Sequence, residues 1–199
     1  MENKKGISKG ILITCLIIVL LVVGIVVGAF YIHNNQPVDV IEEDLVGGNV
    51  SLTYSDEENL FVIENAIPTS DMVGTKLDSA ELFFDFTVKT EIEDANYVEY
   101  EIILVKDEST STSLNDNIKV YLEKEKRGTY SKVVEPTIFK TNLTDAELGS
   151  DLMSVYKQKK TSSGSDNYRL RLWVSDTAVF NVGEVQNFGI KIALKGVAK

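Results

Sequence analysis

The chain has 199 residues, with 20 basic and 30 acidic side chains and a formal net charge of −10. An acidic protein of this kind is repelled by the phosphate backbone, so we expect no nucleic-acid partner. Its only cysteine is Cys15 and its only histidine is His33. The chain after His33 therefore has no residues for a disulfide, a thiol nucleophile, a histidine triad or a Cys/His zinc site. We predict no catalytic residue, cofactor or metal.

The N-terminal residues predict a membrane anchor. Residues 1–10 form a leader with three lysines and one glutamate, and an uncharged apolar run of 22 residues begins at Ile11 and ends at Ile32. A helix of that length rises about 33 Å, enough to span a bilayer core of about 30 Å. Because cytoplasmic flanks are rich in lysine and arginine, we expect the leader in the cytoplasm and residues 33–199 outside the cell membrane.

The apolar run also allows two other interpretations. Small residues ending at Ala29 would suit signal peptidase, although the run exceeds the roughly 7–15 residues of a secretion signal, which favours a retained anchor. Gly24 and Gly28 form a GxxxG step that lets two membrane helices approach closely. This face is therefore a candidate for pairing between two copies of the chain.

The part outside the membrane predicts a mainly β fold. Residues 33–49 are expected to be a linker, because Pro37 and two adjacent glycines disfavour helix. Apolar and polar residues then alternate with a period of two, which predicts strands with one buried face. Seven to nine such strands predict an antiparallel β-sandwich, jelly-roll or immunoglobulin-like, over residues 50–199. The predicted strands cover residues 50–54, 60–64, 82–88, 98–104, 118–122, 130–134, 137–139, 168–174 and 188–194.

One stretch departs from the β pattern. Residues 144–147 have the spacing of a capping box, and Leu148, Leu152 and Tyr156 then recur every four residues. This spacing predicts one short helical insert between two strands, weakened by Gly149.

The polar segments between strands predict solvated loops. Residues 109–117 and 157–167 are rich in serine, threonine, asparagine and lysine. Acidic clusters lie at 56–58, 91–94 and 145–151. Paired carboxylates can bind calcium or hydrolyse glycan, but no cluster has the alternating ligands and glycine of a calcium loop. We expect mostly solvated carboxylates and keep a carboxylate-dependent extracellular hydrolase as an alternative.

One polar strand face is a candidate partner-contact patch. Arg169, Arg171 and Trp173 alternate with apolar residues, and Lys191 and Lys195 would lie near them if the last strand paired alongside. An exposed tryptophan flanked by arginines could bind an acidic or sugar partner. The interpretation that we favour is that these side chains pack on each other or under the predicted helix.

Several short segments occur in a suggestive order. They are NVSLTY after the linker, NAIPTSDMVGTKL before the strand LFFDFTV, then YRLRLWV and the terminal FGIKIAL. Together with the apolar leader, this layout resembles the TasA/camelysin family of secreted biofilm-matrix proteins. The resemblance implies a disulfide-free jelly-roll sandwich and an extracellular structural or fibre-forming subunit. It carries over no catalytic residue, and the metallopeptidase label of camelysin would need zinc ligands that this domain lacks.

These features together lead to one functional expectation. We expect a single-pass, membrane-anchored β-sandwich that acts as a structural or binding module at the cell surface, without catalysis. Its partners would be the membrane, through residues 11–32, and a surface protein, a glycan or a second copy of the chain. The alternatives are a fibre subunit released by cleavage near Ala29 and the hydrolase.

Overall fold

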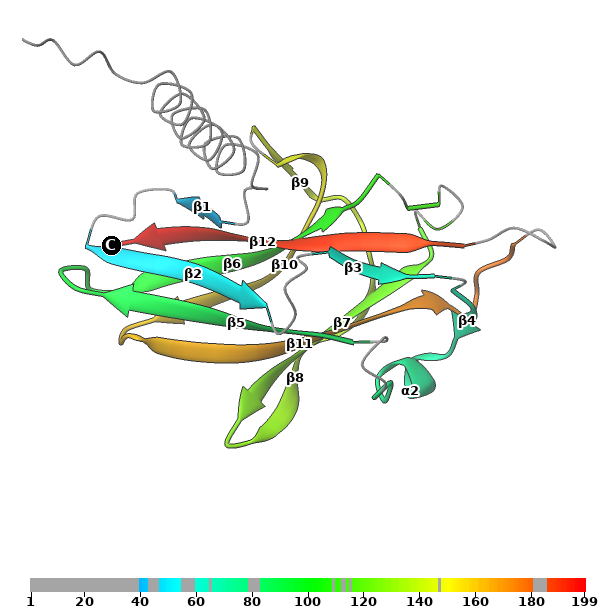
Figure 1. Ribbon diagram of the computed structural model, residues 1–199, viewed down its shortest axis with the longest axis horizontal. Helices are drawn as coiled ribbons and strands as arrows, with labels where there is room; N and C mark the ends of the chain where they lie inside the picture. Colours follow the sequence, from blue (N-terminus) through cyan, green and yellow to red (C-terminus); the bar gives the residue numbers. More distant parts are fainter. Residues whose placement is uncertain are drawn as a thin grey trace, which may run out of the picture. The chain divides into compact units, whose positions relative to one another are not determined.

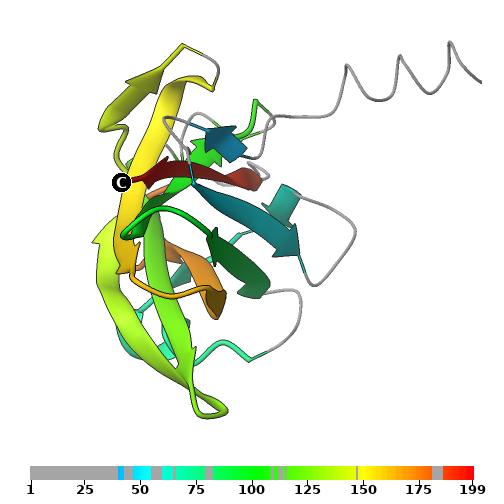
Figure 2. The same cartoon turned by 90° about the vertical axis from the view of Figure 1, so that its left-hand side faces the viewer.

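Two β-sheets packed face to face make up the described part of the protein (Figure 1, Figure 2). The structure is a computed structural model. It describes residues 40–42, 47–54, 60–64, 66–78, 83–108, 110–111, 114, 116–146, 148–180 and 186–199.

In the first sheet, the C-terminal strand pairs with three other strands. Neighbouring strands are antiparallel except for one parallel pair, formed by the first and last strands of the described chain. In order across the sheet the strands are β1 (Val40–Glu42), β12 (Phe188–Ala198), β6 (Val98–Lys106), β10 (Gly149–Lys160) and β9 (Leu143–Asp145), and β3 (Leu60–Ile63) also pairs with β12.

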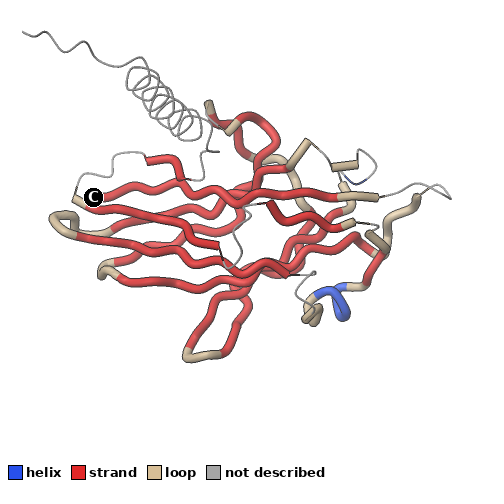
Figure 3. Tube along the Cα trace, in the orientation of Figure 1, coloured by secondary structure: helices blue, strands red, loops and turns tan. Residues whose placement is uncertain are grey.

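The second sheet is built around β11 (Gly164–Ser175). In order its strands are β2 (Gly48–Tyr54), β5 (Phe83–Ile92), β11, β7 (Ile118–Lys126) and β8 (Thr129–Ile138), and β4 (Pro68–Thr69) adds a short parallel pairing to the end of β11. Among the described residues the single α-helix is α2 (Asp71–Gly74), which follows β4 (Figure 3).

The core lies between the two sheets, as the period-two alternation predicted. In β6, the side chains of Val98, Tyr100, Ile102 and Leu104 are buried while Glu99 is exposed. The strands β5, β7, β11 and β12 also contribute buried residues to this core. The predicted mainly β sandwich is therefore confirmed. Among the apolar residues that fill the core from other strands are Phe84, Phe86, Val88, Val120, Leu122, Tyr168, Leu170, Leu172, Ile190, Ile192 and Leu194.

The helix predicted after residue 144 is wrong. That stretch forms the β9–β10 hairpin, whose second strand begins directly after the turn with Gly149, at a φ of +94°. The Asp145 carboxylate accepts a hydrogen bond from the Leu148 amide at 3.4 Å, so the capping-box chemistry closes a turn instead of starting a helix. Leu148 packs with Leu152 on Ile103 at the outer face of the first sheet, which explains the apolar spacing.

Three predicted boundaries also change. Residues 157–167 are a tight hairpin rather than a long loop, because β10 continues to Lys160 and β11 begins at Gly164. The two weak strands around Pro136 form one edge strand, β8, with a register shift at the proline. The range 33–49, predicted as a linker, contains all of β1 and the first two residues of β2.

The predicted anchor lies outside the described residues. This applies to the basic leader, to residues 11–32, to the glycines Gly24 and Gly28, and to Ala29. Within the part of the chain that the structure describes, no helix is long and apolar enough to cross a bilayer.

A substitution at Gly149 tests whether this stretch is a hairpin or a helix, because the two structures predict opposite changes in the free energy of unfolding. In a helix, Gly149→Ala would stabilise the protein by about 1 kcal/mol. Because φ is positive here, we expect the substitution to lower the unfolding free energy by about 1–2 kcal/mol, measured by denaturant titration. Gly164→Ala is the control, since its added Cβ would also meet no atom within 4 Å but its φ is not in the left-handed region. A stabilised Gly149→Ala protein would contradict the hairpin.

Candidate functional site

Arg169, the first residue of the predicted contact patch, forms an ion pair within the domain. Its Nε and Nη2 atoms donate to the two carboxylate oxygens of Asp85, at 2.7 and 2.6 Å, across the β5–β11 pairing. The Arg169 guanidinium carbon also lies 3.8 Å from the ring centre of Phe83 and 4.4 Å from that of Tyr130. The hydrogen bonds to Asp85 raise the pKa of Arg169. This arginine therefore joins β5, β11 and β8.

Arg171 and Trp173 hold the segment that contains α2. Arg171 is only 7% exposed, forms an ion pair with Glu123, and donates from Nε to the Leu77 carbonyl at 2.6 Å. Trp173 is 3% exposed and lies under Gly74, where an added Cβ would come within 2.3 Å of the indole ring. Only glycine allows so close an approach of the backbone to this ring.

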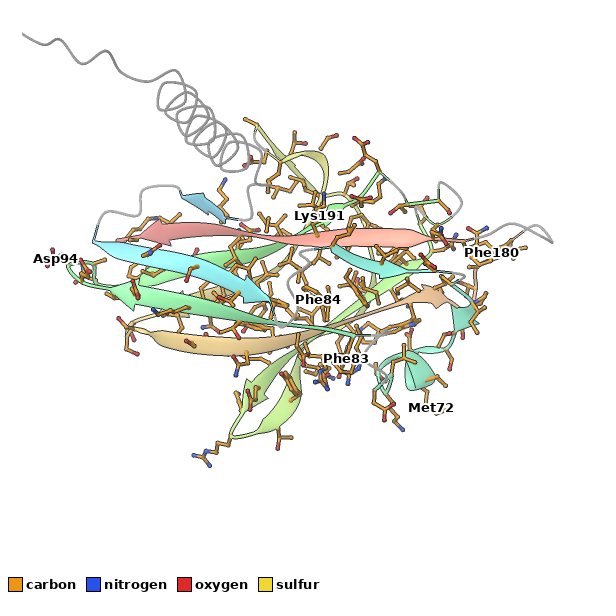
Figure 4. All side chains as sticks on the ribbon, viewed as in Figure 1. Met72, Phe83, Phe84, Asp94, Phe180 and Lys191 are labelled. Atoms are coloured by element: carbon orange, nitrogen blue, oxygen red, sulfur yellow. The ribbon has the colours of Figure 1, made fainter. Side chains whose placement is uncertain are left out.

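The predicted exposed contact patch is therefore wrong for Arg171 and Trp173. The side chains do pack internally, as we favoured, but under α2 rather than under a helix after residue 144. The lysines of the last strand are not beside them either, because β12 belongs to the other sheet. Figure 4 shows Lys191 on that sheet and Phe83, which stacks on Arg169, on the second sheet.

Packing α2 onto β11 creates an apolar pocket of 280 Å³. Two of its lining side chains project into solvent, because Ile67 is 73% and Val73 49% exposed, and Met72, the neighbour of Val73 in α2, is 72% exposed. Met72 extends outward from α2 (Figure 4). A cluster of exposed apolar side chains beside a pocket is typical of a binding surface. The pocket is lined by Ile63, Glu64, Ala66, Ile67, Thr69, Val73, Leu77, Leu172, Trp173 and Val174.

A second, polar groove of 450 Å³ contains two carboxylates, Asp116 and Asp151. Asp151 forms an ion pair with Lys106 at 3.5 Å, and Lys140 also lines the groove above the buried ring of Phe139. Charges of both signs suit a polar ligand. Among the described residues, no group of three or more histidine, cysteine or acidic side chains could hold a metal ion.

A buried polar cluster joins the two sheets near the β10–β11 hairpin. Asp166 accepts from Lys124 at 2.9 Å, from Lys160 at 3.0 Å and from the Tyr100 hydroxyl at 2.8 Å. The hydroxyls of Tyr100 and Tyr168 are 2.5 Å apart. Because Tyr100 donates to Asp166, the Tyr168 hydroxyl must donate to Tyr100. These bonds connect β6 and β10 of one sheet with β7 and β11 of the other.

The pKa values in this cluster follow from its burial and its pairing. Burial alone would raise the pKa of Asp166, but hydrogen bonds from Lys124, Tyr100 and Lys160 outweigh it and lower that pKa. Burial raises the pKa of Tyr100, and the neighbouring Tyr168 raises it further. Burial also raises the pKa of Tyr168, although its hydrogen bond with Tyr100 acts in the opposite direction. The cluster thus holds an ionised aspartate and two neutral tyrosines. These paired groups stabilise the packing of the two sheets.

Sequence reasoning did not identify the residues around the apolar pocket. A signal was present, because Ile67, Met72 and Val73 are large apolar residues in a segment punctuated by Pro68 and Gly74. Such residues outside a regular strand or helix need a packing partner or become exposed. Whether these residues are packed or exposed depends on the position of β11, about 100 residues later in the chain. The local sequence does not determine that position.

Asp166 gives a prediction with a defined pH dependence. Asp166→Asn leaves Lys124 and Lys160 without their carboxylate, so we expect a loss of about 3 kcal/mol of unfolding free energy at neutral pH. A folded-state pKa below the unfolded value stabilises the protein above about pH 4, and this stabilisation is lost as the pH falls through the folded value. The difference between wild type and variant in urea unfolding should therefore shrink in acid.

The control for this experiment is Asp94→Asn. Asp94 is exposed in the β5–β6 turn (Figure 4), and its replacement should change the unfolding free energy by less than about 0.5 kcal/mol. Equal effects of the two substitutions, or a difference that does not depend on pH, would contradict the assigned role of Asp166.

No protein-family profile and no curated protein matches the sequence. The VP2 subviral particle of infectious bursal disease virus is 11% identical, with a TM-score of 0.36 over 76% of this chain and 32% of the viral one, so this chain spans about a third of that protein. CpGH89CBM32-5 from Clostridium perfringens, solved with GalNAc-β-1,3-galactose, is 13% identical, with a TM-score of 0.26 over 71% of this chain and 99% of its own. The K1 cleaved adhesin domain of Lys-gingipain from Porphyromonas gingivalis is 9% identical, with a TM-score of 0.28 over 79% and 95%. Likenesses this distant carry no argument about function.

Proposed function

We propose that the protein is a binding module of the cell surface, held in the membrane by residues 11–32, and that it binds a partner without catalysing a reaction. The uncharged apolar run and its basic leader support the membrane tether. The sandwich supplies a rigid scaffold, since both sheets contribute to one apolar core.

The apolar pocket beside α2 carries the proposal. Without the leader's four charges, the chain has 17 basic and 29 acidic side chains, a net charge of −12. In a chain with this net charge, Ile67 and Val73 nevertheless stay exposed at one pocket, and Met72 is exposed beside Val73 in α2. Exposed apolar side chains gain free energy when a partner covers them, at roughly 25 cal/mol per Å² buried.

β1 and the pocket lie at different points along β12. The first described strand meets β12 at Val40↔Leu194, whereas β3 meets it at Ile63↔Phe188, next to the pocket. Six residues of β12 separate these two points, or about 20 Å of extended strand. A chain that joins the sandwich at β1 therefore need not cover the pocket.

Two alternatives keep a specific motivation. A released fibre subunit, cleaved near Ala29, is what the resemblance to TasA and camelysin implies. The second alternative is a carboxylate-dependent hydrolase. The polar groove supports it, because Asp116 and Asp151 both line this groove. That function would need both carboxylates to act on one glycan, whereas Asp151 already pairs with Lys106.

A photoreactive amino acid at the pocket tests the binding role. Placed at Met72 in the full chain and expressed in the native cell, it should cross-link to a defined cell-surface component on illumination, detected by mass spectrometry. The same group at Val179 is the matched control, because this residue is 91% exposed but lies outside α2 and the residues that line the pocket, whereas Met72 is next to the lining residue Val73. No adduct, or the same adducts from both positions, would contradict a binding surface at α2.

The mass of the mature protein tests the anchor. If residues 1–32 are retained, the protein from the native membrane should have the full mass of 22.1 kDa, apart from loss of the initiator methionine. A product that begins after Ala29 would instead support the released subunit. Extraction with alkaline carbonate is the accompanying check, since only a chain that spans the membrane should stay in the pellet.

A further inference from the structure

We propose that the pocket beside α2 binds an extended segment of a partner protein that presents one large apolar side chain flanked by lysine or arginine. This inference rests on the proposed function and adds the chemistry of the partner. Two observations carry it: the size of the pocket, and the charge of the chain around it.

The pocket lies beside a stretch of β11 for which, among the described residues, no pairing is present on one edge. On one edge of β11, pairing with β5 ends at Arg171↔Phe83, and pairing with β4 begins at Val174↔Pro68. Leu172 and Trp173 lie between these pairings and line the pocket. Its 280 Å³ is below the roughly 300–1,000 Å³ of pockets for drug-sized ligands. A space of this size suits one or two side chains, which is how an apolar anchor of a protein partner binds.

The surrounding charge favours a basic partner. Glu64 lines the pocket and is exposed, and Asp71 and Asp78 lie in the segment around α2. Lys76 lies in the same segment, and Lys119 pairs with Asp71 at 3.3 Å, so the local excess is small. The decisive contribution is the net charge of −12 outside the leader, which attracts cationic segments and repels acidic ones over about one Debye length.

The experiment uses the full chain in phosphatidylcholine vesicles and a display library of random 12-residue peptides, with empty vesicles for counter-selection. We expect enrichment of peptides that combine a large apolar residue with an excess of lysine and arginine. Trp173 is the only tryptophan, so binding of a synthesised peptide can be followed by its emission. A peptide with glutamate in place of lysine and arginine should bind at least about tenfold more weakly, or about 1.4 kcal/mol.

Matched variants place the binding at the pocket. Ile67→Asp and Val73→Asp should each weaken the selected peptide at least tenfold, while Val179→Asp should leave its affinity within twofold. All three positions are exposed, and unchanged unfolding midpoints will show that the fold is intact. Enrichment of acidic peptides, no enrichment at all, or equal effects at Val179 would overturn the proposal.

The alternative of membrane insertion has its own outcome. Brominated phosphatidylcholine quenches tryptophan at membrane depth, so quenching of Trp173 before any peptide is added would show the pocket in the bilayer and refute a peptide site. The two proposals also fail separately. If a surface component is cross-linked at Met72 but the selected peptides are acidic, the proposed binding function stands and the proposed basic partner is refuted. If no component is cross-linked, the proposed binding function itself is refuted.

Discussion

Burial of β11 on both faces is the constraint on which the rest of the structure depends. Its inward side chains, such as Leu170, fill the core, and its outward side chains Arg171 and Trp173 are covered by the segment around α2. A strand buried on both sides cannot be shifted by one residue without placing charge in the core. Trp173 lies under α2 and also lines the pocket, so the packing of the second sheet and the shape of the pocket depend on the same side chain.

Much of the fold could be predicted because alternation within a strand is a local property. Val98 to Leu104 and Phe84 to Val88 show their buried faces directly in the sequence, and the structure places them in the core. The prediction failed after residue 144, where apolar residues spaced by four pack on a neighbouring strand rather than along a helix. A glycine at positive φ decided between the two, and its conformation is set by the hairpin, not by its neighbours in sequence.

The site was much less predictable than the fold. The pattern of Arg169, Arg171 and Trp173 shows that they share a face, but the residues that cover this face come from β4, α2 and β5, many positions earlier. Side chains that can bind a partner can equally pack on, or hydrogen-bond to, the chain's own backbone. The exposed residues Met72 and Val73 became recognisable only once their neighbours were known. The segments that cover Arg171 and Trp173 lie far from them in the sequence. This is the physical reason why the residue pattern of this strand alone indicated the wrong candidate binding surface.

The proline in β8 has a consequence for assembly. This strand closes the order of the second sheet among the described strands, and ten residues of an open edge would offer a template for a strand of another molecule. Pro136 has no amide hydrogen to donate and lies where the register with β7 shifts, a position at which edge strands tolerate proline. Lys132 adds a charge on the same strand. Stacking of sandwiches along this border is thereby disfavoured, so a filament built from this chain would have to grow through another edge.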